Sequence, residues 1–376
     1  MNTGGVESQV SPSDAEARLQ SRLLRLVKIV YLLKTVWAVI AALLIGAVFI
    51  LLAGGNPLEG YNALFRGAFA DYWGISDTLV RMSPLLLAGL AVIIPLRAGL
   101  FNIGAEGQIY IGALFATIAA LYLPDVLPGF VRIVLCIAVG AFGGALWAAI
   151  PGLLKAYRGT NEIITSLLLS YVAINMIGAV LHSWLIEPGA PYPYSREVPD
   201  EVILPIFMPR TQAHVGIMIA WVAALLVAIM FWRTTLGQSI QIVGHNKHAA
   251  SYAGLNVKRL TVMSFALGGS MGGLAGVFEV LGLKYRLFDH FSPGYGMQGI
   301  IVAFLAALNP VGAILAAIFL AGLQVGAGSM QRATGIDTTM VAALQGLVVL
   351  CVAIGLAFKF HPDRWRRRIA AWRGGR

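Results

Sequence analysis

Charged residues are scarce in this chain of 376 residues: Asp, Glu, Lys and Arg make up 12% of it, whereas hydrophobic residues make up 58%. Because charges account for about a quarter of an average soluble domain, this composition excludes an ordinary soluble protein. The mean hydropathy of +0.79 indicates a protein that crosses a membrane several times. Its apolar runs are continuous rather than alternating, which favours helices and excludes a membrane β-barrel.

Cysteine is nearly absent as well. Cys136 and Cys351 each lie in an apolar run with no second cysteine or histidine at ligand spacing, so we expect neither an obligatory disulfide nor a metal site. The chain also contains no Gly-Lys pair, and therefore no phosphate-binding loop of the GxxxxGK[ST] type. If nucleotide hydrolysis drives this protein, another subunit binds the ATP, and this chain needs no cofactor of its own.

The formal net charge is +10, which in a soluble protein would suggest a nucleic-acid partner. Here the basic residues gather in short loops and tails beside apolar runs, where the orientation of a membrane protein explains them. We therefore expect no nucleic-acid binding. By the positive-inside rule, the basic segments and both termini lie in the cytoplasm.

Since about 20 apolar residues span a bilayer, the sequence predicts an all-α, polytopic membrane domain over residues 35–358 with about ten transmembrane helices. A tail with an interfacial amphipathic helix (1–34) precedes it, and a basic cytoplasmic tail (359–376) follows it. Five spans in each half are compatible with an inverted five-helix pseudo-repeat. The predicted spans are 35–53, 79–96, 105–123, 129–150, 162–186, 213–232, 260–282, 297–308, 310–328 and 340–358.

A polar, glycine-rich segment, LRAGLFNIGAEGQ, interrupts the hydrocarbon after the second predicted span. Such a break is tolerated at membrane depth only inside protein or beside a watery cavity. One interpretation is a substrate path lined by Asn102, Glu106 and Gln108. The other is a cytoplasmic turn with Arg97 at the headgroups and Glu106 at a helix start, where the helix dipole favours its charge. The glycines that mark the break are Gly99, Gly104 and Gly107.

Two further segments stand out on the other side of the predicted membrane core. SPGYGMQG places Pro293, Gly294, Gly296 and Gly299 before a short apolar run, and interrupted segments in corresponding halves point to a central binding site. The proline-rich external loop 187–212 predicts irregular or partly extended backbone. It is either a structured cap or a docking surface for an external partner.

The span 260–282 carries Gly268, Gly272 and Gly276 four residues apart, a spacing that lets helix backbones approach closely. The same span contains GGSMG, a formal G-x-S-x-G match at Ser270. A nucleophile elbow needs a strand-to-helix turn with positioned His and acidic partners, whereas Ser270 lies within a predicted helix. We therefore do not expect an enzyme.

The long cytoplasmic loop 233–259 contains GHNKHAASYAG. Asn246 is suited to cap a short helix that ends at Gly254. Its exposed face would offer small residues around one aromatic, a shape that fits the groove of another protein. His245 and His248 lack a third ligand in reach, so we take them as solvated. The residues of the predicted face are Ala249, Ala250, Tyr252 and Ala253.

Four segments in this order and spacing resemble the permease subunits of bacterial ABC importers for nucleosides, within the larger group of ribose and branched-chain amino acid permeases. They are PLRAGLFNIGAEGQIYIGALFA, RGTNEIITSLLLSYVAINMI, GHNKHAASYAGLNVKR and PGYGMQGIIVAFLAALNPVGAILAA. The resemblance covers roughly residues 80–358, and LFNIGAEGQ with GTNEI is typical of the nucleoside branch.

The resemblance implies a translocation path with Asn102, Glu106, Gln108 and Asn161 as candidate residues. It also implies a full importer in the bacterial inner membrane, with a second permease chain (the same or a different one), cytoplasmic ATP-binding subunits and an external substrate-binding protein. ATP would be bound by the ATPase. The implied ATPase-coupling residues are Gly244, His245, Asn246, Ala249, Ala250, Tyr252, Ala253 and Gly254.

Three alternatives remain beside this prediction. The same machine could carry a sugar or a branched-chain amino acid. A secondary transporter driven by an ion gradient would need an acidic coupling site deep in the membrane, for which Glu106 and Glu279 are candidates. An intramembrane protease would depend on Ser270 as its nucleophile.

Overall fold

The computed structural model describes residues 34–52, 54–335, 337 and 339–357. The predicted amphipathic helix in the N-terminal tail and the basic tail 359–376 lie outside the described residues. Within them, helices dominate and β-structure is limited to isolated bridges. The helices are α2 (Lys34–Leu52), α3 (Pro57–Phe69), α4 (Tyr72–Arg97), α5 (Ala105–Tyr122), α6 (Gly129–Leu153), η1 (Leu154–Arg158), α7 (Glu162–Ser183), η2 (Asp200–Val202), α8 (Gly216–Arg233), α9 (Thr235–His245), α10 (Lys247–Tyr252), α11 (Val257–Glu279), η3 (Val280–Lys284), α12 (Tyr295–Leu305), α13 (Pro310–Thr334) and α14 (Thr339–Ala357).

Among the described residues, seven helices are long and apolar enough to cross a membrane, namely α4, α5, α6 continued by η1, α7, α8, α11 continued by η3, and α13. They coincide with seven of the ten predicted spans. The bent pair α2 and α3 passes the same test only as one broken span, which would make eight. Both α12 and the tested part of α14 are apolar but shorter. The all-α prediction is confirmed for the described residues, while the count of ten spans is not.

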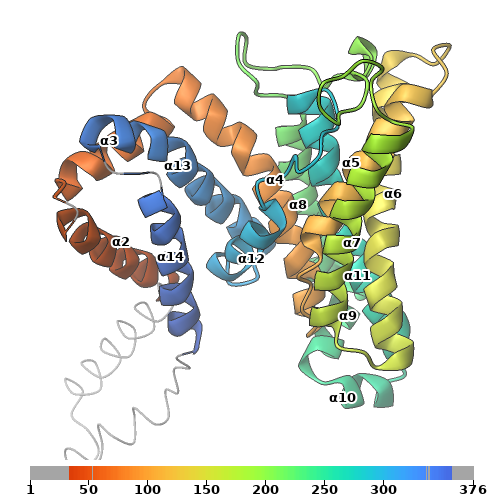
Figure 1. The fold of residues 1–376 in the computed structure, drawn as a ribbon. Coiled ribbons are helices and arrows are strands. Elements are labelled where there is room, and N and C mark those ends of the chain that lie inside the picture. The colour runs from red at the N-terminus through yellow and green to blue at the C-terminus, as the bar shows by residue number, and fades with distance from the viewer. Residues whose placement is uncertain (1–33, 53, 336, 338, 358–376) are drawn as a thin grey trace, which may run out of the picture.

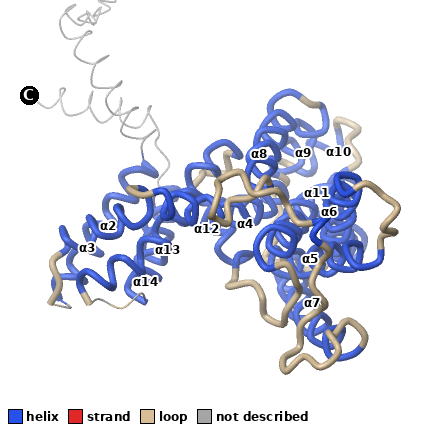
Figure 2. The backbone as a smooth tube through the Cα atoms, turned by 90° about the horizontal axis from the view of Figure 1, so that it is seen from above, coloured by secondary structure: helices blue, strands red, loops and turns tan. Residues whose placement is uncertain are grey.

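The helices form two groups joined at the centre by α4 and α12 (Figure 1). One group holds α5 to α11, and the other holds α2, α3, α13 and α14. Figure 2 shows the same division from above. In the smaller group α3 packs on α13 and α2 packs on α14, while α4 contacts both α12 and α13. The two groups therefore meet through this central pair and through a direct contact of α13 with α8.

The centre of the larger group is α11, which packs against α4, α5 and α6. Its predicted glycine stripe lies at these contacts. A Cβ added at Gly272 would lie 2.9 Å from the Cβ of Gln108, and one at Gly276 would lie 2.7 Å from the Ala113 amide nitrogen. Gly268 faces α4 in the same way. Backbones this close leave no room for a side chain.

Side-chain caps set where many helices begin. Asn246, for example, extends in the β region before α10, and its side chain accepts the amides of His248 and Ala249. Because the first amides of a helix have no partner within the helix, such a cap fixes the start. The same role falls to Asn56, Asp71, Asn161, Thr234, Asn256 and Asn309 at the starts of α3, α4, α7, α9, α11 and α13.

Candidate functional site

The predicted break after α4 is a tight turn held by Asn102. Pro95 has no amide hydrogen, so the carbonyl of Ala91 lacks its normal helical donor. The side-chain nitrogen Nδ2 of Asn102, which is fully buried, donates to that carbonyl at 3.0 Å. Its Oδ1 accepts the Gly104 amide at 3.0 Å. Asn102 thus closes the gap that the proline opens.

Gln108 completes this arrangement from the first turns of α5. Its Nε2 donates to Asn102 Oδ1 at 3.1 Å, and its Oε1 accepts from Asn102 Nδ2 at 3.2 Å. Gln108 is 1% exposed. Both amides face inward, as predicted, and both are bonded to the protein itself in this conformation, so they hold the turn together.

Two serines of α7 complete the start of α5. The Ile103 amide donates to Ser166 Oγ at 3.3 Å, and the Gly107 amide donates to Ser170 Oγ at 3.2 Å. This role of the two serines was not predicted from the sequence, although two serines four residues apart on one apolar helix are a usable signal. Asn161, by contrast, is exposed and caps its own helix by accepting the Ile163 amide at 3.0 Å.

The two interrupted segments predicted to form a central site lie in contact. Glu106 Oε2 accepts the Gly296 amide at 2.5 Å, and its carboxylate also faces Ser292 and Gly294. A Cβ at Gly296 would lie 2.6 Å from the Glu106 Cα. The carboxylate of Glu106, a residue of intermediate exposure, therefore sits at the N-terminus of α12, where the helix dipole stabilises a negative charge.

A cavity of about 340 Å³ opens beside this junction. Tyr295, the first residue of α12, lines it together with Arg81 and Lys284. Glu279 lies buried near by, with its Oε2 4.0 Å from Lys284 Nζ. The other lining residues are Asp77, Val80, Gln212, Leu283, His290, Phe291 and Pro293.

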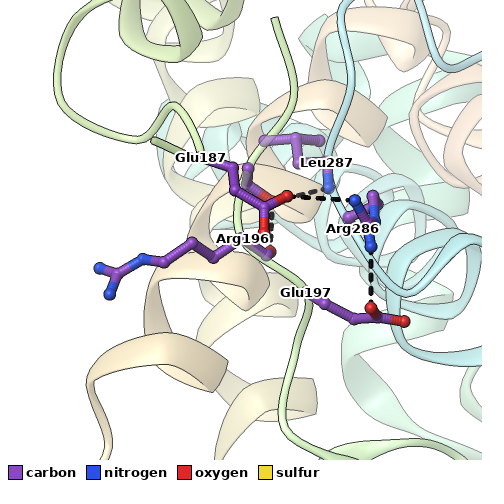
Figure 3. Close-up of polar contacts among 6 residues, drawn as sticks. Glu187, Arg196, Glu197, Arg286 and Leu287 are labelled. Atoms are coloured by element: carbon purple, nitrogen blue, oxygen red, sulfur yellow. Dashed lines mark hydrogen bonds and ion pairs between the residues drawn. The ribbon is translucent and has the colours of Figure 1, made fainter. Parts of the chain in front are cut away.

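The proline-rich loop is a structured cap over the end of the molecule opposite α10. Arg286 donates to Glu187 at 3.2 Å and to Glu197 at 2.8 Å (Figure 3). The Ser195 amide donates to the Leu287 carbonyl at 2.8 Å. Extended backbone of the loop thus pairs with the segment after η3. These contacts favour the structured-cap interpretation and leave the docking interpretation as a prediction.

The predicted helix after Asn246 is confirmed as α10, and Gly254 follows it with φ of +78°. Tyr252 is 94% exposed, and Ala249 and Ala253 are exposed as well. The predicted exposure of Ala250 is wrong: its side chain is fully buried. Successive residues of a helix point in different directions, and Ala250 lies on the side of α10 that packs on α9 and α11.

The remaining candidates lie in ordinary helical surroundings. Gly244 packs against the end of α4, where a Cβ would lie 3.0 Å from the Ala98 carbonyl carbon. His245 Nδ1 lies 2.8 Å from the Gln241 carbonyl oxygen. Ser270, within α11, donates to the Leu267 carbonyl at 2.8 Å. Among the described residues, no group of three or more His, Cys, Asp or Glu is arranged to hold a metal ion.

Known proteins are similar in sequence to this chain over most of its length. The chain is 35% identical to the glucose ABC transporter permease protein TsgB13 of Haloferax volcanii, over 90% of each chain. It is 31% identical to the guanosine ABC transporter permease protein NupP of Bacillus subtilis, over 90% of this chain and 97% of that one. It is 32% identical to the nucleoside ABC transporter permease protein NupB of Lactococcus lactis, over 84% and 89%.

These relatives, the apolar helices and the polar junction between α5 and α12 describe a multi-pass membrane subunit of an ABC transporter. Residues 74–353 match a family described as the permease component of the branched-chain amino acid transport system. The chain belongs to that family of membrane permeases.

Proposed function

We propose that this chain is the permease subunit of an importer for nucleosides or related purine and pyrimidine compounds. The observation that carries the proposal is the similarity to a guanosine permease and a nucleoside permease over most of each chain. The LFNIGAEGQ and GTNEI segments point in the same direction. The subunit conducts solute and performs no covalent step.

A sugar importer is the second candidate, because the chain is 35% identical to a glucose permease. Direct binding of guanosine, uridine, glucose and leucine to the cognate external binding protein separates the candidates. We expect guanosine or uridine to bind and the others to leave the signal unchanged. Binding of glucose alone would move the assignment to sugars, and binding of leucine alone to amino acids.

The proposed complex contains a second permease, an external binding protein and an ATPase that binds the ATP. We place α9 and α10 in the cytoplasm and the cap at the outer face, because the basic loops lie at the α10 end. The ATPase contacts the exposed surface of α10 and the residue after it, chiefly Ala249, Tyr252 and Ala253. An ion-coupled carrier would instead accumulate solute in vesicles that hold this chain without any ATPase.

We propose that Glu106 faces the translocation path, because it is partly exposed whereas its neighbours Asn102 and Gln108 are buried. Asn102 and Gln108 support it from within, and Asn161 shapes the start of α7. Substrate hydroxyl and amide groups can bond to the Glu106 carboxylate when α12 moves away from it.

The Glu106→Gln variant tests this assignment. We expect ATP-dependent uptake of the bound nucleoside to fall about tenfold, a typical effect of losing one hydrogen bond to a charged group, while membrane insertion stays normal. The matched control is Glu59→Gln, since Glu59 also lies in the first turn of a helix but is exposed. Normal uptake by the Glu106 variant would remove it from the path.

A further inference from the structure

One side chain at the end of α4, Arg97, joins three other parts of the molecule. Its Nε donates to the Leu308 carbonyl at 3.0 Å. Its Nη1 donates to Gln241 Oε1 at 3.0 Å. Its guanidinium carbon lies 5.5 Å from the centre of the Phe231 ring. The end of α8, the helix α9 and the turn between α12 and α13 therefore meet at one residue.

The turn that Arg97 holds has an unusual backbone. Ala307 and Leu308 adopt positive φ angles of 49° and 61°, a region that residues with side chains rarely occupy. Such turns persist when surrounding contacts determine them. The Arg97–Leu308 bond is a contact of this kind, and the turn ends α12, the helix whose start is capped by Glu106.

Gln241 connects this residue to α9. While its Oε1 accepts from Arg97, its Nε2 donates to the Phe231 carbonyl at 2.9 Å. One amide thus bonds α9 to both α8 and α4. Only Asn246 separates α9 from α10, so movement of α10 reaches Gln241 through a short helix.

The backbones of α9 and the α4 end are also in direct contact. A Cβ at Gly99 would lie 3.2 Å from the Gly244 carbonyl oxygen, and one at Gly244 would lie 3.0 Å from the Arg97 carbonyl carbon. Two glycines facing each other leave no flexible side chains between the helices. A shift of α9 therefore displaces the end of α4 and the Arg97 side chain with it.

We propose that Arg97 is a positioning residue that transmits movement of α9 and α10 to the α12–α13 turn, and so to the helix that Glu106 caps. The inference rests on the proposed function, in which α10 contacts the ATPase. Its consequence is specific: without Arg97, the ATPase still binds and hydrolyses ATP, but hydrolysis no longer moves solute.

The chemistry of the site requires arginine rather than any cation. The planar guanidinium donates in two directions and lies over the Phe231 ring at the same time, whereas a lysine ammonium on its flexible stem cannot reproduce this geometry. No carboxylate forms an ion pair with Arg97 within the described part of the chain. An anchor at the lipid headgroups would accept lysine equally well, so Arg97→Lys separates the two roles.

The first test uses the whole complex, with its ATPase, second permease and binding protein, in proteoliposomes. ATP hydrolysis and guanosine uptake are measured on the same preparation for Arg97→Lys, Arg97→Gln and Gln241→Ala. We expect hydrolysis to stay within about twofold of the unsubstituted complex, while uptake per ATP falls about fivefold or more, as for typical coupling energies. The Arg97→Gln/Gln241→Ala double variant should have no lower uptake per ATP than Arg97→Gln, because the Arg97–Gln241 bond is already lost in the single variant.

Two controls frame the result. Arg233→Gln removes an exposed charge at the end of α8 and should leave uptake per ATP unchanged. Tyr252→Ala on α10 should lower hydrolysis and uptake together, because it weakens the ATPase contact itself. Normal uptake per ATP in Arg97→Lys would overturn the proposal. A parallel loss of hydrolysis and uptake in Gln241→Ala would overturn it too, because that variant removes the acceptor of Arg97 Nη1 and the donor to the Phe231 carbonyl but substitutes no residue of α10.

A second measurement does not depend on the solute. Spin labels at Lys247 on α10 and at Leu315 on α13, each paired with a label at Val126 on the opposite end, report movement when ATP is added. We expect both distances to change in the unsubstituted complex and only the Lys247 distance to change in Arg97→Gln. If both distances change in Arg97→Gln, the proposal that Arg97 transmits the movement is wrong. If neither changes in the unsubstituted complex, the proposed ATPase contact is wrong.

Discussion

Single side chains in this protein form hydrogen bonds with backbone groups that have no water to bond with inside the membrane. The clearest case is Asn102, which supplies the donor that Pro95 withholds from Ala91. An unpaired carbonyl inside an apolar body costs about 1–3 kcal/mol. The two hydrogen bonds between the side-chain amides of Asn102 and Gln108 are therefore needed to stabilise the turn after α4.

We expect Asn102→Ala to lower the free energy of unfolding by about 1–3 kcal/mol, because it leaves the Ala91 carbonyl and the Gly104 amide without partners. Unfolding of the purified chain in mixtures of SDS and mild detergent measures the change. The matched control is Asn175→Ala on α7, whose exposed side chain bonds only within its own helix. Equal stability of both variants would show that water or lipid replaces the Asn102 bonds.

His214 provides a pH-dependent prediction outside the membrane-spanning helices. It lies just before α8, is 2% exposed, and its burial lowers its pKa to about 4. Between that value and the ordinary pKa of about 6.5, the unfolded chain binds the proton and the folded chain does not. Stability should therefore fall as the pH drops from about 6.5 towards 4, by up to about 3 kcal/mol.

Thermal unfolding of the purified protein at a series of pH values measures this effect. The comparison is His214→Phe, which keeps an apolar ring against Phe278, now 6.4 Å from the imidazole centre. The variant should lose the part of the pH dependence that belongs to His214. An unchanged slope between pH 4 and 6.5 would contradict the assignment.

At the scale of helices, packing is controlled by where side chains are missing. Gly276 on α11 lies against the backbone of α5, with the position of a Cβ 2.7 Å from the Ala113 nitrogen. We expect Gly276→Ala to cost about 1–3 kcal/mol, because the two helices must separate to admit a methyl group.

The control for that variant is Gly346→Ala. Gly346 is also within a helix, α14, but a Cβ there would meet nothing within 4 Å. The same SDS unfolding experiment should show a change within about 1 kcal/mol, in the stabilising direction that helix propensity favours. A similar loss in both variants would mean that glycine matters for flexibility and not for close packing.

Sequence patterns predicted the elements whose signals are local. Hydropathy identified the seven long spans, and the Asn246 cap with Gly254 identified α10. Two helices were missed: α3 mixes Glu59 and Arg66 with apolar residues, so its hydropathy is low, and α9 is amphipathic and lay in a segment treated as loop. The burial of Ala250 could not be read from α10 alone, because it depends on how α10 packs on α9 and α11.

The candidate site was predictable in part. The glycine breaks and the inward direction of Asn102 and Gln108 follow from the intolerance of lipid for open backbone. That Glu106 meets Gly296 across 190 residues of sequence separation depends on the tertiary arrangement. The contact of Arg97 with Leu308 also depends on the tertiary arrangement. The sequence alone did not indicate it, because an arginine beside an apolar run fits a headgroup anchor equally well.

At the scale of the whole molecule, the cap opposite α10 is tied to the segment after η3 by side-chain and backbone hydrogen bonds. Arg286 bonds to Glu187 and Glu197 and also lies 5.0 Å from the Tyr194 ring centre. We expect Arg286→Gln to speed amide hydrogen exchange in residues 187–198. Each partly exposed ion pair is worth at most about 1 kcal/mol, so the cap should loosen while the helices stay folded.

Arg196→Gln is the matched control, because Arg196 lies in the same segment and its side chain points away from both carboxylates (Figure 3). It should leave the exchange rates of the cap unchanged. Hydrogen-exchange mass spectrometry of the purified chain measures both variants. Similar rates in the Arg286 variant and the unsubstituted chain would place the anchoring of the cap in its backbone pairing instead.

The dependence of α4 on Asn102 also bears on how the protein is made. When the end of α4 leaves the ribosome, Asn102, whose side chain pairs with the Ala91 carbonyl, is still inside the ribosome, and Gln108, which bonds to Asn102, emerges later still. If α4 entered the bilayer alone, its Ala91 carbonyl would therefore have no hydrogen-bond donor. The smallest unit that lipid can accept at little cost is the hairpin of α4 with α5, and biogenesis of this permease should proceed by delivering the two together.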